Sequence, residues 1–293
     1  MTNAATITNE PGINPCDLID SGTQLTVLPA AVPELLAALN DDELSFKELA
    51  DTVAQFPTIA ARLLFLANSS WAAPVAEITT IEGACAKLGL AVVKSVSVSI
   101  AIAAPFDPAK CPAFHSEQFW SSALLVADVA SWLAECSEKI DDKDVATVHT
   151  AALLHNLGLL WMADSIPGET AQALLMAKNN SDLSLADALK HTCGADYAQV
   201  GGCLARAWNL PGVIESAMKN HLDFSYAGDH WQVAQLTGYA ATMVHCLNHG
   251  IEALPEDMRL ERLGVRSEQR DAIFERLQGR YENVREMVRV LFC

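Results

Sequence analysis

The chain has 293 residues, enough for one large domain or two modest ones with an ample core. Hydrophobic residues make up 51% of it and charged residues only 19%, which excludes a disordered polypeptide. The net charge of −17 disfavours a nucleic-acid surface, because such a surface needs basic side chains to displace counterions. This charge fits a basic protein partner, or simply a soluble surface.

No targeting or membrane-spanning segment is predicted. The first fifteen residues, MTNAATITNEPGINP, are polar and lack the apolar centre of a signal peptide. The most apolar stretch, residues 88–105, contains Lys94 and three serines. It falls short of the ~20 apolar residues that a transmembrane helix needs. We therefore expect a cytoplasmic protein that does not contact a membrane.

The cysteines show no metal-binding or redox spacing, because no C-x-x-C pair is present. In a reduced compartment they are expected to be small buried hydrophobic side chains, with a reactive thiol as the alternative. The eight positions are Cys16, Cys85, Cys111, Cys136, Cys193, Cys203, Cys246 and Cys293.

The chain begins with a segment that carries no structural signal, and residues 1–19 are expected to form a flexible tail. Residues 32–70 follow Pro29 and have the pattern of three amphipathic helices. Within them, Ser45 and Glu48 have the spacing of a capping box, which predicts a helix start at Ser45.

Thr79 and Glu82 repeat the capping-box spacing, and Gly89 is suited to end the helix that follows. Residues 94–105, KSVSVSIAIAAP, alternate apolar and polar side chains, a period typical of a strand. No neighbouring segment resembles a partner strand. We therefore predict a buried helix whose serines and alanines allow close packing.

The second half of the chain is also predicted to be helical. A proline-bearing linker over residues 106–118 precedes a series of amphipathic segments that continues to residue 250. We expect a tail, an N-terminal helical lobe, a second helical lobe and a C-terminal helical extension, over residues 1–19, 20–112, 113–250 and 251–293 respectively.

The C-terminal segment predicts one long helix that starts at Ser267 as its N-cap. Its apolar residues recur at spacings of three and four and form a single stripe. We predict that this stripe packs against the body of the protein, with a dimer contact as the alternative. The stripe consists of Ile273, Leu277, Tyr281, Val284, Val288 and Leu291.

Several stretches together resemble the HDOD domain, a bacterial signalling module related to the HD phosphohydrolases. They are residues 27–71, then ITTIEGACAKLGL, then ALLHNLGLL at 152–160, and ADYAQVGGCLARAWNLPGVIESAMKNH at 195–221. The resemblance covers roughly residues 22 to 250. It implies an all-α fold in two lobes, of which the second is HD-like, and a role in regulation.

The active relatives implied by this resemblance hydrolyse phosphate esters at a metal site of several histidines and aspartates, where the metal activates water. Here the carboxylates are replaced and only two imidazoles remain, so His155 and His221 are weak metal candidates. We expect no catalytic residue, metal or other cofactor. The degenerate positions are Ser122, His155, Asn156, Tyr197, Asn220, His221 and Ala241.

The remaining histidines are expected to be structural. His155 lies among leucines and reads as a core residue, with Asn156 bonded to backbone. His149 is six residues earlier and does not face the same side of a helix. His245 and His249 share a helix face, but no third ligand is evident and His249 suits the last helical turn.

The predicted function is a non-catalytic signal-transduction module that binds a regulatory, basic protein partner or a small ligand in the former HD cleft. One alternative is a metal-dependent phosphohydrolase or phosphodiesterase acting on a nucleotide. Another is a small-ligand sensor without turnover. The oligomeric state stays open.

Overall fold

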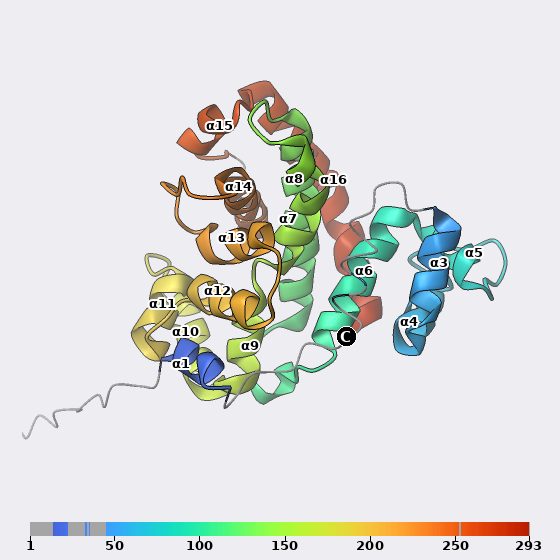
Figure 1. Ribbon diagram of the computed structural model, residues 1–293, viewed down its shortest axis with the longest axis horizontal. Coiled ribbons are helices and arrows are strands. Elements are labelled where there is room, and N and C mark those ends of the chain that lie inside the picture. The colour runs from blue at the N-terminus through green and yellow to red at the C-terminus, as the bar shows by residue number, and fades with distance from the viewer. Residues whose placement is uncertain (1–13, 23–32, 34, 36–44, 252, 293) are drawn as a thin grey trace, which may run out of the picture.

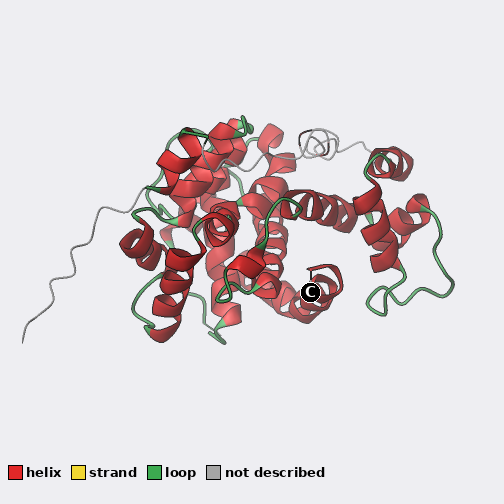
Figure 2. Ribbon diagram, turned by 90° about the horizontal axis from the view of Figure 1, so that it is seen from below, coloured by secondary structure: helices red, strands yellow, loops and turns green. Residues whose placement is uncertain are grey.

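The computed structural model describes residues 14–22, 33, 35, 45–251 and 253–292, and the secondary structure within them is entirely helical. Figure 2 shows helices joined by loops, without a strand in the described part of the chain. The predicted all-α fold is therefore confirmed. No single helix among the described residues is long and apolar enough to cross a membrane. Only one pair of helices, α5 (Ile81–Leu88) and α6 (Leu90–Ala103), bent by 114° at their junction, passes by length and composition.

The N-terminal helices form two groups in Figure 1. The first helix lies beside α12 on the larger part of the molecule, whereas α3 to α5 stand apart from it and α6 lies between. Their bounds are α1 (Pro15–Asp20), α3 (Phe46–Ala54), α4 (Pro57–Ala67), α5 (Ile81–Leu88) and α6 (Leu90–Ala103).

Local capping signals set two of these starts. The Ser45 hydroxyl accepts from the Glu48 backbone N–H at 3.3 Å, and the Glu48 carboxylate accepts from the Ser45 N–H at 2.9 Å, as predicted. The N-cap of α5 was predicted one residue too early. Thr80, rather than Thr79, accepts from the Gly83 N–H at 3.0 Å, and Gly89 ends α5 at φ +85°.

The strand-like stretch is a buried helix, α6, which confirms the helical prediction up to Ala103. A helix covered on all sides needs no amphipathic period, and every residue from Ser95 to Ile102 is buried. Two of its three serine hydroxyls bond to the helix backbone: Ser95 donates to the Ala91 carbonyl and Ser99 to the Ser95 carbonyl, each at 2.8 Å, whereas the Ser97 hydroxyl has no hydrogen-bond partner among the described residues.

Within the larger group of helices, α7 and α8 pack against each other and lie on the side that faces α6 (Figure 1). A short 3₁₀ turn in the predicted linker, η1 (Pro108–Lys110), precedes this group. The helices are α7 (Ser116–Cys136), α8 (Asp142–Leu154), α9 (Leu157–Ser165), α10 (Pro167–Asn179), α11 (Leu185–Cys193), α12 (Tyr197–Ala207), α13 (Gly212–Asn220) and α14 (Trp231–Asn248). The division of the chain into separate lobes stays a prediction.

The C-terminal extension forms α15 (Met258–Leu263) and α16 (Ser267–Phe292). The apolar stripe of α16 packs against α7, as predicted, with Leu277 and Val288 fully buried. The helix also reaches the N-terminal helices, because Arg62 donates to the Leu291 carbonyl at 2.8 Å and Trp71 to the Asn283 carbonyl at 2.9 Å. It thus joins both parts of the molecule.

Two cysteines contradict the expectation of reduced thiols. Cys16 of α1 and Cys203 of α12 form a disulfide across 187 residues, with Cα atoms 5.8 Å apart. The packing of α1 on α12 brings them together, and no local spacing in the sequence indicates such a contact. Four of the five free cysteines that the structure describes are buried, as predicted: Cys85, Cys111, Cys193 and Cys246.

Candidate functional site

The structure brings the two weak metal candidates into direct contact. His155 follows the last residue of α8 and His221 the last residue of α13, and these helices pack against each other. The two ring centroids lie 5.0 Å apart with the rings edge to face, and each residue is 2% exposed. The position that the resemblance assigns to a metal site is thus a closed pair of imidazoles.

Backbone carbonyls fix the tautomer of both rings. His155 Nδ1 lies 2.6 Å from the Ala152 oxygen, and His221 Nδ1 lies 2.9 Å from the Ala217 oxygen. A carbonyl can only accept, so each neutral ring carries its proton on Nδ1 and a lone pair on Nε2. His221 Nε2 has no hydrogen-bond partner among the described residues. Metal-binding histidines use this same tautomer.

Burial keeps both imidazoles neutral. It lowers the pKa of His155 to about 3, assisted by the neighbouring His221. It also lowers the pKa of His221 to about 4, although bonds to two backbone carbonyls act in the opposite direction. At neutral pH the pair therefore carries no charge.

Tyr197, another of the degenerate positions implied by the resemblance, lies against His221 of the imidazole pair. It is the first residue of α12, and its ring centroid lies 5.7 Å from that of His221. Burial raises the pKa of its hydroxyl above the usual range, so it stays protonated at neutral pH. The adjacent carboxylate of Asp196 is already engaged: it caps α12 and pairs with Lys190 at 3.0 Å.

Two glycines allow the backbones to approach at this centre. A Cβ atom on Gly158 of α9 would lie 2.0 Å from the Tyr197 carbonyl oxygen. One on Gly238 of α14 would lie 2.1 Å from the His221 carbonyl oxygen. These contacts leave no room for any larger residue, and they hold Tyr197 and His221 against their neighbours.

The other degenerate positions take different surroundings. Ser122 accepts from the Asn248 amide at 3.2 Å, and Asn248 in turn accepts from the Tyr281 hydroxyl, so Ser122 faces the α16 side of α7. Asn156 is the N-cap residue of α9 but makes no side-chain cap bond. Asn220, in the last turn of α13, and Ala241 of α14 are both partly exposed.

A buried arginine was missed by sequence reasoning. Arg259 of α15 is 1% exposed, and its Nε donates to the Asp257 carboxylate at 2.9 Å. Its Nη2 donates to Thr242, the neighbour of the degenerate position Ala241, at 2.9 Å, and its guanidinium lies 4.3 Å from the centre of the Phe224 ring. In the sequence it is one of eight arginines between positions 259 and 289, and nothing distinguishes it locally.

Arg259 also lies beside the histidine centre. A Cβ atom on Gly238 would meet Arg259 Nη1 at 2.8 Å as well as the His221 carbonyl. The guanidinium, which is paired with Asp257, therefore lies near the His221 backbone, and it adds a minor contribution to the lowering of the His221 pKa that burial causes.

The donor set does not fit a divalent metal. Two imidazole nitrogens without a carboxylate fall short of the three or more ligands that such sites use. No group of three or more His, Cys, Asp or Glu side chains in the described part of the chain could hold a metal ion.

The remaining histidines lie elsewhere. His149 contacts Ser95 at 3.3 Å and Asp128 at 3.6 Å, away from the pair, as predicted. His245 and His249 have ring centroids 4.1 Å apart at the end of α14, where His249 caps the helix and donates to the His245 carbonyl at 2.9 Å. Burial, followed by the neighbouring His249, lowers the pKa of His245.

Comparison with known proteins relates this fold to a family. Residues 25–224 match the HDOD domain. A curated protein of uncharacterized function from Treponema pallidum (strain Nichols) is 22% identical over 217 residues, which are 74% of this chain and 40% of that protein. The chain thus spans less than half the length of this curated relative.

Three solved structures share the fold. A proposed signal transduction protein from Marinobacter aquaeolei VT8 has a TM-score of 0.80 at 19% identity, covering 96% of this chain and 62% of that one. An HDOD domain protein of unknown function from Geobacter sulfurreducens has a TM-score of 0.70 at 20% identity, and the match covers 94% of this chain and 98% of that one. A proposed phosphohydrolase from Shewanella amazonensis SB2B has a TM-score of 0.68 at 21% identity, and the match covers 96% of this chain and 99% of that one.

Proposed function

Because the chain belongs to the HDOD family, we propose that it is a non-catalytic signal-transduction module that acts through a regulatory protein partner. Among the structures of like fold are a proposed signal transduction protein and a proposed phosphohydrolase. The fold is therefore compatible with both activities, and the choice between them depends on the site.

The composition of the histidine centre carries the proposal. A metal-dependent hydrolase must generate hydroxide at neutral pH, and this requires a cation held by several histidines and carboxylates. Here two neutral, 2% exposed imidazoles contact each other, Tyr197 lies against His221, and the nearby Asp257 carboxylate is already paired with Arg259. The same closure argues against a small ligand at this point, because the rings occupy the space.

The charge of the chain supports a basic partner. The net charge is −17, and several basic residues of α16 are already paired within the molecule. Arg280 pairs with Asp128, and both Arg285 and Arg289 pair with Glu117. The acidic excess is left to attract a partner of opposite charge.

One observation favours the phosphohydrolase alternative. The Nε2 lone pair of His221 has no hydrogen-bond partner among the described residues, and it has the tautomer of a metal ligand. This alternative requires further ligands from elsewhere, such as substrate oxygens or water. A direct measurement of metal content separates the two functions.

The first experiment is elemental analysis of protein purified without a chelator or a metal-affinity tag. We expect less than about 0.1 equivalent of any transition metal, because two imidazoles bind a divalent ion weakly. Near-stoichiometric metal that disappears in His155→Ala/His221→Ala but persists in His245→Ala/His249→Ala would overturn the proposal. The second pair is the matched control, since it removes two imidazoles from the exposed end of α14.

A partner capture at two salt concentrations tests the regulatory role. The full chain, immobilised and exposed to extract from its source cells, should retain a basic protein at low salt. Raising the salt from about 0.05 M to 0.5 M should release that protein, since exposed charges are screened within a few ångströms at high ionic strength. Retention of an acidic protein only, or binding insensitive to salt, contradicts the charge argument.

A further inference from the structure

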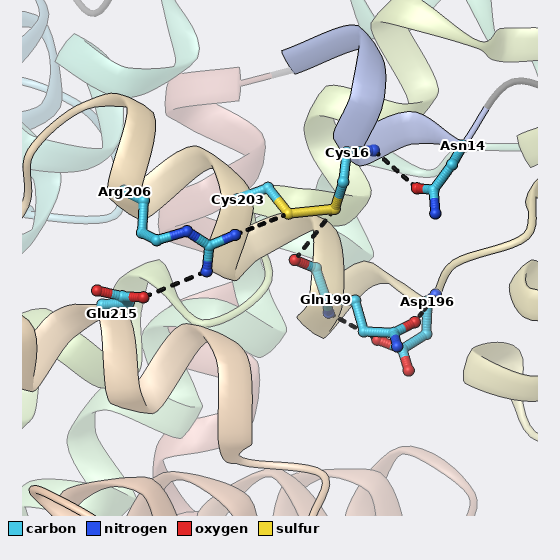
Figure 3. The surroundings of a disulfide bond; sticks show 7 residues. All are labelled: Asn14, Cys16, Asp196, Gln199, Cys203, Arg206 and Glu215. Carbon is cyan, nitrogen blue, oxygen red and sulfur yellow. Dashed lines mark hydrogen bonds and ion pairs between the residues drawn. A yellow bond between two sulfur atoms is a disulfide. The ribbon is translucent and has the colours of Figure 1, made fainter. Parts of the chain in front are cut away.

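The disulfide between Cys16 and Cys203 has an asymmetric environment (Figure 3). Cys16 lies on the short helix α1 and is partly exposed, whereas Cys203 of α12 is 5% exposed. The Arg206 guanidinium, one turn further along α12, contacts Cys203 Sγ through Nη2 at 3.3 Å. Its other terminal nitrogen is held by the Glu215 carboxylate of α13, also at 3.3 Å.

We propose that Cys16–Cys203 is a reversible thiol–disulfide site that a dithiol reductant opens, releasing α1 from α12. The cysteine usage argues against a purely structural staple. Five other described cysteines are free, whereas proteins that rely on disulfides for stability are small and pair most of their cysteines. This chain of 293 residues has an extensive core of its own.

Exposure and charge determine how the bond breaks. The reductant thiolate attacks the accessible sulfur of Cys16, because the Cys203 sulfur is buried. The S–S electron pair passes to Cys203 Sγ, which leaves as a thiolate beside the Arg206 guanidinium. A neighbouring positive charge stabilises a thiolate and makes it a better leaving group.

The second thiolate of the dithiol completes the reaction. It attacks the reductant's own sulfur in the mixed disulfide on Cys16, so the reductant becomes an internal disulfide. Cys16 leaves as a thiolate, and both protein thiolates take protons from water. One protein disulfide and one dithiol therefore yield two protein thiols and one oxidised dithiol. The reverse exchange, with a disulfide as the oxidant, closes the site again.

Loss of the covalent bond leaves α1 weakly attached. This helix has only six residues, too few to persist as an isolated helix in water. Its buried side chains are Pro15 and Ile19, and Asn14 caps it by accepting from the Cys16 N–H at 2.9 Å. The reduced state thus uncovers the face of α12 on which α1 packs, on the helix that begins with Tyr197.

Peptide mapping tests the connectivity. The full chain is alkylated under air without reductant, digested and analysed by mass spectrometry. We expect a cross-linked pair of peptides containing Cys16 and Cys203, with alkyl groups on the free cysteines once the protein is unfolded. Reduction with dithiothreitol before the alkylation step should free both thiols, so that both residues are then alkylated. Alkylation of both residues before any reduction, or a different pairing, overturns the proposal.

Reduction kinetics test the order of attack and the role of Arg206. Arg206→Met should slow the reduction by dithiothreitol about three- to tenfold at pH 7, whereas Arg276→Met, on α16, should leave the rate unchanged. Glutathione, a monothiol, should leave an adduct on Cys16 rather than on Cys203. An equal rate in Arg206→Met, or an adduct on Cys203, contradicts the proposed chemistry.

Hydrogen exchange measures the release of α1 in the wild-type chain. Reduction should raise the exchange rate of the α1 amides at least tenfold, while the amides in the middle of α16 keep their rate as an internal reference. Cys16→Ser/Cys203→Ser should show the fast rate under both conditions, and Cys85→Ser should respond like wild type. Equal α1 exchange in oxidised and reduced wild type overturns the release.

Discussion

Glycine at position 158 determines how closely α9 and α12 approach behind the histidine pair. An added Cβ would lie 2.0 Å from one backbone atom, the Tyr197 carbonyl oxygen, and 2.6 Å from another, the Gly201 nitrogen. Neither can rotate away as a side chain would. The helices must therefore separate if Gly158 is replaced, and the centre must loosen with them.

We expect Gly158→Ala to lower the free energy of unfolding by about 3 kcal/mol or more, because overpacking against backbone forces a helix shift. Gly279→Ala is the matched control. It lies within α16 with open space around its Cβ, so it should raise the free energy of unfolding by about 0.5–1 kcal/mol. Urea unfolding measures both. A Gly158→Ala protein as stable as wild type would contradict the close crossing.

The imidazole pair predicts acid sensitivity. In the folded chain the pKa values lie at about 3 for His155 and about 4 for His221, below the value of about 6.5 for an unfolded chain. The unfolded state therefore binds protons first as the pH falls. Their contribution to stability is present above pH 6.5 and is lost progressively as the pH falls through about 4 and then about 3.

From pH 7 to pH 5 we expect the free energy of unfolding to fall by roughly 2–4 kcal/mol from these two groups. Urea titrations at the two pH values measure this loss. His155→Gln/His221→Gln should remove most of it, whereas His245→Gln/His249→Gln should retain it. A loss of the same size in both double variants would assign the acid sensitivity to other groups.

At the scale of single helices, the short helix α15 is held to the rest of the molecule by a buried ion pair between Arg259 and Asp257. Arg259 reaches from this six-residue helix to Asp257 and Thr242, and Phe224 covers it. A buried charge is tolerated only while its partner remains, since desolvation of either ion alone is costly. The pair thus fixes the extension against α14 and the loop that follows α13.

Arg259→Met should lower the free energy of unfolding by about 3–5 kcal/mol, because it leaves the Asp257 carboxylate unpaired. The double variant Arg259→Met/Asp257→Asn should recover at least half of that loss. Arg266→Met serves as the comparison on an exposed side chain, with a change within about 0.5 kcal/mol. Chemical denaturation of these proteins, together with the single variant Asp257→Asn, gives the coupling between Arg259 and Asp257.

Sequence reasoning succeeded where the determinants of a helix are local. The capping box of Ser45 lies within four residues, and the stripe of α16 repeats within one turn. It was less accurate at Thr79, where two adjacent threonines compete for one cap. In α6 the alternating pattern favours a strand, and only the absence of a partner strand led to the correct prediction.

The candidate site could be predicted only in part. The resemblance placed His155, His221 and Tyr197 at related positions, and the structure brings these three together. Arg259 and the Cys16–Cys203 bond depend on contacts between helices far apart in the chain. No pattern within a window of residues encodes such a contact, so it emerges only when the helices are packed.

At the scale of the whole molecule, α16 joins the N-terminal helices to the larger group and also neutralises acidic side chains of α7. It carries arginines that pair with Glu117 and Asp128 of α7, both in a region with a strong acidic excess. Pairs of this kind are only partly exposed and lower the local repulsion along α7. The acidic side chains left without such partners determine the net field of the molecule.

The bond from Cys16 to Cys203 also makes a closed ring of most of the chain. A cross-link across 187 residues restricts the unfolded ensemble, and the loss of its entropy is worth about 5 kcal/mol at 25 °C. Reduction should therefore lower the melting temperature by about 5–10 °C, while Cys16→Ser/Cys203→Ser should melt at the lower temperature with or without reductant. Calorimetry with and without a phosphine reductant measures this difference, and an unchanged wild-type melting temperature would contradict it. The redox state of the surroundings would then govern not one short helix alone but the lifetime of the entire folded chain.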